Sequence, residues 1–179
     1  MSKIHILSST DRPNSNALKV AEYAESLFKD FSEVETFSLR DFPLKDVVGG
    51  KYGKDVESVK EFNSAFLDAD GFLFVVPEYN GGFPGILKLF IDYLPFPKAL
   101  EMKPVSFIGE ADGSFGALRP IEHLQQIFVY RKALVYPERM FISNVNETFD
   151  VKTGLKSEML QGLLEDQIKG FLKFVETNS

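Results

Sequence analysis

The chain has no cysteine and no tryptophan among its 179 residues. Without cysteine it can form no disulfide, no thiolate metal site and no catalytic thiol, and a reducing compartment is the default. No apolar run approaches the roughly 20 residues that span a bilayer. A strand pattern begins directly after Met1-Ser2-Lys3, so we expect no signal peptide. The sequence therefore predicts a cytoplasmic protein without a membrane segment.

The chain also lacks a basic patch. Its formal net charge is −6, and its lysines and arginines are scattered along the sequence. Binding to nucleic acid or to an anionic membrane needs clustered positive charge. We therefore expect neither a nucleic acid nor a membrane as a partner.

Acid–base and metal machinery is missing as well. His5 falls inside a strand pattern and His123 on a helix pattern, and we find no Ser-His-Asp set, no metal-ligand spacing and no paired carboxylates. There is also no GxGxxG fingerprint and no GxxxxGK[ST] loop, so neither tightly bound NAD nor ATP is indicated. An enzyme without such groups usually leaves the chemistry to a cofactor.

What is present alternates between strand and helix patterns. With 44% apolar and 26% charged residues, the composition is that of one globular domain spanning residues 1–179. Strands are expected at 4–7, 34–39, 72–76, 105–108 and, bent around Pro137, at 134–142. Apolar stripes predict helices at 18–28, 56–66, 86–94, 118–128 and 159–175, with Asp55 as the N-cap of the second.

Strands that alternate with helices indicate a parallel sheet with right-handed crossovers. Five strands and five helices in this length favour an α/β, three-layer, flavodoxin-like fold with strand order 2-1-3-4-5. In such a sheet, ligands bind beyond the carboxyl ends of the strands, beside the switch between the first and third strands. This topology places three loops side by side, at residues 8–16, 77–85 and 109–116.

The second of these loops is the most informative stretch, Pro77-Glu78-Tyr79-Asn80-Gly81-Gly82-Phe83-Pro84-Gly85. It follows a strand pattern that is apolar at every position, as in a strand buried on both faces of a parallel sheet. Backbone N–H groups, a ring and an amide suit a flat, hydrogen-bonding ligand. The alternative is an Asn-Gly surface turn of type I′, which we disfavour because the loop joins a strand to a helix and not two hairpin strands.

The first loop is Ser9-Thr10-Asp11-Arg12-Pro13-Asn14-Ser15-Asn16. It leads into a helix, whose free N–H groups and dipole favour an anion, and Arg12 adds a charge for a phosphate. Taken alone, this loop is explained more simply by Ser15 or Asn14 capping the helix and a solvated Arg12. The third loop, residues 109–116, holds three glycines, which suit either a ligand close to the backbone or tight turns alone.

With the three loops together, the chain resembles the NAD(P)H-dependent FMN reductase family of flavodoxin-like quinone, azo and chromate reductases. Residues 77–85 resemble the family's P-E-Y-N-G-S-x-P-G, with Gly82 in place of Ser. Residues 9–16 resemble its G-S-x-R-x-x-S-x-N loop, with Ser9 where the family often has Gly, and residues 113–116 are similar to its G-G-x-x-G-G segment. The departures at Ser9 and Gly82 could loosen the flavin.

The resemblance implies FMN as cofactor, NADPH or NADH as co-substrate, and hydride transfer through flavin N5 to a small-molecule electron acceptor, in ping-pong order. No side chain is expected to be catalytic. The residues implied in cofactor binding are Ser9, Thr10, Arg12, Ser15 and Asn16 at the phosphate, and Pro77, Glu78, Tyr79, Asn80, Gly81, Gly113 and Phe115 at the ring. Phe83, Phe96, Phe115 and Tyr79 could also wall an acceptor pocket, or simply pack.

Two further expectations concern function class and assembly. The alternative to a reductase is a flavodoxin-type electron carrier, which would be expected to show a T-x-T-G-x-T loop and a more acidic surface than this chain has. A homodimer or tetramer is implied by the resemblance. Weaker support comes from the apolar character that extends past the third helix, in Phe90, Tyr93, Leu94, Pro95, Phe96 and Pro97.

Overall fold

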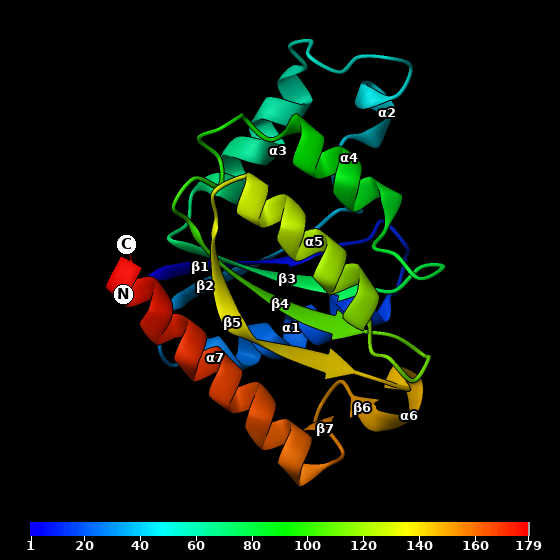
Figure 1. Cartoon of the computed structure of the whole chain (residues 1–179), viewed down its shortest axis with the longest axis vertical. Coiled ribbons are helices and arrows are strands. Elements are labelled where there is room, and N and C mark those ends of the chain that lie inside the picture. Colours follow the sequence, from blue (N-terminus) through cyan, green and yellow to red (C-terminus); the bar gives the residue numbers. More distant parts are fainter. Residues whose placement is uncertain (179) are drawn as a thin grey trace.

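A computed structural model describes residues 1–178, and it has a central parallel sheet of five strands in the order β2-β1-β3-β4-β5 (Figure 1). The strands are β1 Lys3–Ser8, β2 Glu33–Ser38, β3 Gly71–Pro77, β4 Pro104–Glu110 and β5 Leu134–Ile142. The pairs β1–β2, β1–β3, β3–β4 and β4–β5 are all parallel. The predicted flavodoxin-like fold and its strand order are confirmed.

Helices cover both faces of the sheet. They are α1 Asn16–Phe28, α2 Leu44–Val47, α3 Glu57–Leu67, α4 Gly85–Tyr93, α5 Leu118–Tyr130, α6 Val145–Thr148 and α7 Glu158–Asn178. α3, α4 and α5 lie on one face, whereas α1 and α7 lie on the other (Figure 1). None of the helices within residues 1–178 is both long and apolar enough to cross a membrane.

Two hydrophobic cores hold the layers together, one on each face of the sheet. All seven residues of β3 are buried, as the continuous apolar pattern predicts. Phenylalanine dominates the core under α3, α4 and α5, where the Phe66 ring packs edge-on against Phe37, Phe74 and Phe90. Burying such a ring stabilises the fold by about 1.5–3 kcal/mol. Most of the phenylalanine content is therefore explained by packing.

Several local features differ from the expectations. Asp55 does not cap α3: Val56 holds that position without a side-chain hydrogen bond, and Asp55 instead pairs with Lys60 at 3.2 Å. The expected bend in β5 is present as an irregular register opposite β4 around Pro137, a residue without a backbone donor. α2, α6 and the hairpin of β6 Phe149–Asp150 and β7 Gly154–Leu155 are too short to show a periodic pattern.

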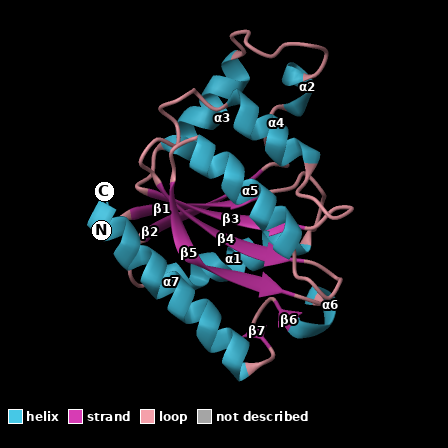
Figure 2. Cartoon of the chain, viewed as in Figure 1, coloured by secondary structure: helices cyan, strands magenta, loops and turns pink. Residues whose placement is uncertain are grey.

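The strands end together at one edge of the sheet, where the loops shown in pink gather (Figure 2). β1 leads to α1 on one face, and its neighbour β3 leads to α4 on the opposite face. Helices that leave in opposite directions open a crevice between the two strand ends. This crevice is where the first and second loops meet.

Candidate functional site

A polar cavity of about 430 Å³ lies at this edge of the sheet. It is lined by Arg12, Pro13, Asn14, Ser15, Asn16 and Lys19, by Pro77, Glu78 and Tyr79, by Glu110, Ala111 and Asp112, and by Asn146. The walls thus come from the β1–α1 loop and α1, the β3–α4 loop, the end of β4 and α6. Segments that are distant in sequence converge here because parallel strands end on the same side of the sheet.

The β1–α1 loop presents the start of a helix to the cavity. Ser15 is the N-cap of α1, and its hydroxyl accepts a hydrogen bond from the backbone N–H of Leu18 at 3.1 Å. The capping interpretation of Ser15 is therefore correct. A capping hydroxyl still has its own proton to donate, so capping does not remove Ser15 from the cavity's donors. The N–H groups of the first helical turn add a positive partial charge.

Ser9 and Thr10, the first two residues of this loop, are buried. The Ser9 hydroxyl donates to the carbonyl of Leu7 at 3.3 Å, and Ser9 is not among the residues with a positive φ. The backbone at position 9 therefore does not need glycine. The Thr10 and Tyr79 hydroxyls form a hydrogen bond of 2.8 Å, which ties the first loop to the second.

Two cations reach the cavity from the α1 side. Arg12 is exposed, and its backbone N–H donates to the Thr10 hydroxyl at 3.3 Å. Lys19, one turn into α1, donates to the Asn16 side chain at 3.3 Å. Asn16 in turn donates to Asn146 of α6 at 2.8 Å. This chain of amides fixes one rim of the cavity.

The β3–α4 loop does contain the type I′ turn that we disfavoured. Asn80 and Gly81 have φ of 52° and 79°, and two backbone hydrogen bonds of 2.8 and 3.0 Å join Tyr79 to Gly82. Positive φ at both central positions defines this turn and explains the Asn-Gly pair. The expectation failed because a tight turn can close between a strand and a helix. Asn80 and Gly81 are not among the residues that line the cavity.

A chain of contacts connects the second loop to the third. Arg119 at the start of α5 lies 3.7 Å from the Glu78 carboxylate, and its guanidinium lies 4.4 Å from the centre of the Phe115 ring. Phe115 is 55% exposed, so much of its ring is accessible at the surface. Glu78 and Tyr79 have separate partners, Arg119 and Thr10, and do not orient one another.

The glycines of the β4–α5 loop have different roles. A Cβ at Gly109 would clash with the carbonyl oxygen of Gly116, and Gly116 has φ of 53° and is in close contact with β5. These two glycines are explained by close backbone packing and a tight turn. Gly113 has open space around its Cα, so no internal packing accounts for it.

Glu110, the last residue of β4, is the most unusual titratable group of the cavity. Its side chain is buried, with the residue only 5% exposed. Burial raises the pKa of the carboxyl to about 7, while the backbone N–H of Ala17 in α1 and the charge of Arg12 oppose that rise. A carboxyl that titrates near neutral pH in a polar cavity marks a candidate functional group.

Of the residues implied in cofactor binding, the structure brings six into the cavity wall: Arg12, Ser15, Asn16, Pro77, Glu78 and Tyr79. Thr10 joins them through Tyr79, whereas Ser9, Asn80, Gly81, Gly113 and Phe115 do not line this cavity. Sequence reasoning gave no role to Lys19, Glu110 or Asn146. Helical spacing from Asn16 could have indicated Lys19, and a charged residue closing an apolar strand could have indicated Glu110. No pattern in the sequence predicts that α6, which carries Asn146, lies at this edge of the sheet.

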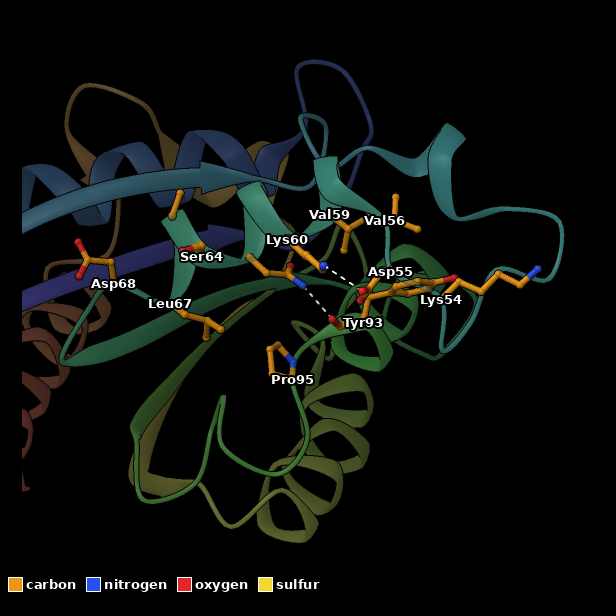
Figure 3. Close-up of a pocket in the computed structure, with 12 residues that line it drawn as sticks. Lys54, Asp55, Val56, Val59, Lys60, Ser64, Leu67, Asp68, Tyr93 and Pro95 are labelled. Carbon is orange, nitrogen blue, oxygen red and sulfur yellow. Dashed lines mark hydrogen bonds and ion pairs between the residues drawn. The ribbon is translucent and has the colours of Figure 1, made fainter.

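A larger cavity, of about 760 Å³, lies elsewhere, between α3 and the chain that leaves α4 (Figure 3). Two pairs of its polar groups contact one another: Lys60 with Asp55, and the Asn63 amide with the Tyr93 carbonyl at 2.8 Å. None of the three loops at residues 8–16, 77–85 and 109–116 contributes to it. Volume alone therefore does not identify a site.

Comparison with known proteins agrees with this geometry. The family model described as NADPH-dependent FMN reductase matches residues 2–147. An NAD(P)H-dependent FMN reductase of Pseudomonas aeruginosa is 32% identical over 143 residues, which cover 74% of this chain and 77% of that protein. A quinone reductase of Escherichia coli is also 32% identical, over 145 residues, covering 78% and 76%.

Among solved structures, the flavoenzyme NAD(P)H:(acceptor) oxidoreductase FerB of Paracoccus denitrificans superposes with a TM-score of 0.83 at 21% identity, covering 99% of each chain. At that identity the likeness concerns the fold. The family match spans the sheet from β1 through β5 and all three loops at its carboxyl edge. On this evidence the chain belongs to the NADPH-dependent FMN reductase family, whose members are FMN-dependent oxidoreductases that use NAD(P)H.

Proposed function

We propose that this protein binds FMN in the polar cavity and passes hydride from NADH or NADPH to small quinone-, azo- or chromate-like acceptors. The observation that carries the proposal is the convergence of Arg12, Lys19 and the start of α1 in one cavity beside the 77–81 loop. The names of the relatives, FMN reductase and quinone reductase, support the same chemistry.

The donor set of the cavity fits a flavin phosphate. Arg12 and Lys19 supply positive charge, the first turn of α1 supplies N–H groups, and Ser15 and Asn16 supply a hydroxyl and an amide. A phosphate at a helix N-terminus with a nearby arginine is a favourable arrangement, since hydrogen bonds to a charged group each contribute about 1.5–3 kcal/mol. These residues would hold the phosphate.

The ring would then extend from the phosphate along the strand ends. Pro77, Glu78 and Tyr79 line the cavity, and the Asn80–Gly81 turn follows them directly in the chain. Gly113 and Phe115 lie on the loop connected to Glu78 through Arg119, where they would flank the pyrimidine side. Phe96 is separate from this group, since it stacks on Tyr130 in a groove between α4 and α5.

The chemistry assigned to the cofactor is hydride acceptance from a nicotinamide and hydride donation to an acceptor. This chain's residues bind and orient the reactants, which is consistent with the lack of acid–base sets in the sequence. A single open face at the site would have to serve donor and acceptor in turn, so we propose ping-pong kinetics.

The test is steady-state oxidation of NADH and of NADPH by FMN-loaded protein with a quinone acceptor. Parallel double-reciprocal lines at several fixed acceptor concentrations are expected, whereas intersecting lines would argue that both substrates bind together. Protein that holds FMN but oxidises neither nucleotide would favour the electron-carrier alternative. Protein that takes up no FMN would refute the proposal.

We further propose that two copies associate through the groove between α4 and α5, a cavity of about 640 Å³. Part of the sequence argument was wrong, because Phe90 and Leu94 are buried in the core. Phe96 and Tyr130 support the proposal instead, being 65% and 73% exposed. Light scattering of flavin-loaded protein tests it: a mass near 20.2 kDa would refute a dimer or tetramer.

The cytoplasmic location also remains a proposal, supported by the absence of cysteine.

A further inference from the structure

Glu110 is a buried carboxyl placed where a flavin phosphate would be bound. The residue is 5% exposed and lines the cavity, and the backbone N–H of Ala17 in the first turn of α1 is close enough to lower the pKa of its carboxyl. The donors at a helix N-terminus favour any anion. In this chain, one of those donors is directed at the protein's own acid.

The charges around Glu110 decide what else the cavity can bind. Arg12 and Lys19 bring two positive charges from the α1 side, and Asp112, on the loop after β4, brings a negative one. Glu78, from the β3–α4 loop, is opposed by Arg119, which lies 3.7 Å away. Ionised, Glu110 and Asp112 together offset both cations. Protonated, Glu110 leaves one positive charge in excess and offers an O–H donor.

We infer that Glu110 links flavin binding to proton uptake: the FMN phosphate binds this cavity tightly only when the Glu110 carboxyl is protonated. The inference rests on the proposed function, since it assumes that FMN occupies the cavity. An ionised carboxylate beside a phosphate dianion is repelled, whereas the neutral acid can donate to a phosphate oxygen.

The titration range makes this coupling relevant at neutral pH. Burial raises the pKa of Glu110 to about 7 in the ligand-free protein. A bound dianion adds negative charge and raises it further. Between pH 7 and 8.5 the affinity for FMN should therefore fall by about sixteenfold, and the loss should approach about tenfold per pH unit at the upper end of that range. Riboflavin, which has no phosphate, should not show this loss.

The first experiment compares FMN dissociation constants by flavin fluorescence between pH 6 and 8.5 in the natural protein, in Glu110→Gln and in Glu61→Gln. Glu61 lies on the exposed side of α3 and controls for a carboxyl-to-amide change. Titration of the ligand's own phosphate, with a pKa of about 6, is common to all three. Glu110→Gln should bind FMN with a flat profile above pH 7, whereas Glu61→Gln should follow the natural protein. Identical profiles in all three would overturn the inference.

The second experiment needs no variant. Calorimetric titration of the natural protein at pH 8, in buffers with different ionisation enthalpies, should show uptake of about one proton per FMN and none per riboflavin. FMN binding without proton uptake would overturn the role of Glu110 and leave the proposed function intact. Absence of both FMN binding and NAD(P)H oxidation would instead refute the proposed function, and the inference with it.

Discussion

The two cavities of this protein differ in what their polar groups do. In the larger one, between α3 and α4, Lys60 is neutralised by Asp55 and Asn63 holds the end of α4, so its polar contacts serve the fold. In the smaller one, at the carboxyl edge of the sheet, Arg12 and Lys19 face a buried Glu110, and the start of α1 opens into the same space. The comparison teaches that charges of both signs converging on a buried carboxyl indicate function better than volume does.

The largest expected effect that separates the two cavities is on stability. Glu110 has a pKa of about 7 when folded, against an ordinary 4.5, so the folded protein binds this proton more tightly than the unfolded chain does. The stability that the carboxyl contributes is present below pH 4.5 and is lost as pH rises to 7. Glu110→Gln cannot ionise, so its stability relative to the natural protein should rise over that range by about 3 kcal/mol.

Urea unfolding of the ligand-free proteins between pH 4.5 and 8 measures this difference. Asp55→Asn, at the exposed ion pair of the larger cavity, is the matched carboxyl-to-amide change. Its difference from the natural protein should stay within about 1 kcal/mol, because exposed ion pairs contribute little. A pH-independent difference between Glu110→Gln and the natural protein would mean that folding does not raise the pKa of the Glu110 carboxyl.

The next effect is on ligand affinity. Arg12→Ala should weaken FMN binding about ten- to a hundredfold at pH 7 and riboflavin binding much less, because a charge-assisted contact to phosphate contributes about 1.5–3 kcal/mol. Lys60→Ala removes a cation from the larger cavity and should leave both affinities unchanged. Equal losses of FMN and riboflavin in Arg12→Ala would assign the residue to the fold and not to the phosphate.

The smallest effect is at the helix cap. Ser15→Ala removes the hydrogen bond from the Leu18 N–H and should lower stability by about 1 kcal/mol. Ser26→Ala, on the exposed side of the same helix, is the matched control and should change stability by less than about 0.5 kcal/mol. Thermal unfolding followed by circular dichroism distinguishes the two. A Ser15→Ala protein as stable as the control would show that the cap is dispensable.

The sequence predicted the fold well because the sheet depends on long, periodic patterns. The uninterrupted apolar run of β3 and the stripes of α1, α5 and α7 are visible without any tertiary information. The short elements α2 and α6 were not predictable in this way, since their positions depend on packing between distant segments.

The candidate site was predictable only in part, for a similar reason. Arg12, Ser15 and Asn16 fall in a motif next to a helix start and could be found from local sequence. Glu110 received no role because its burial and its contact with α1 follow from the pairing of β4 with β3, which places it across the sheet edge from residues about 100 positions earlier. Asn80 and Gly81 show the opposite case, in which a local turn signal was correct and was discounted.

The most direct test of the account is a crystal structure of the protein grown with FMN at pH 6. The account predicts that the phosphate lies at the start of α1, within hydrogen-bonding distance of the Arg12 side chain and the Glu110 carboxyl, and that the ring follows residues 77–81. A flavin bound between α3 and α4, or one whose phosphate points away from α1, would contradict it.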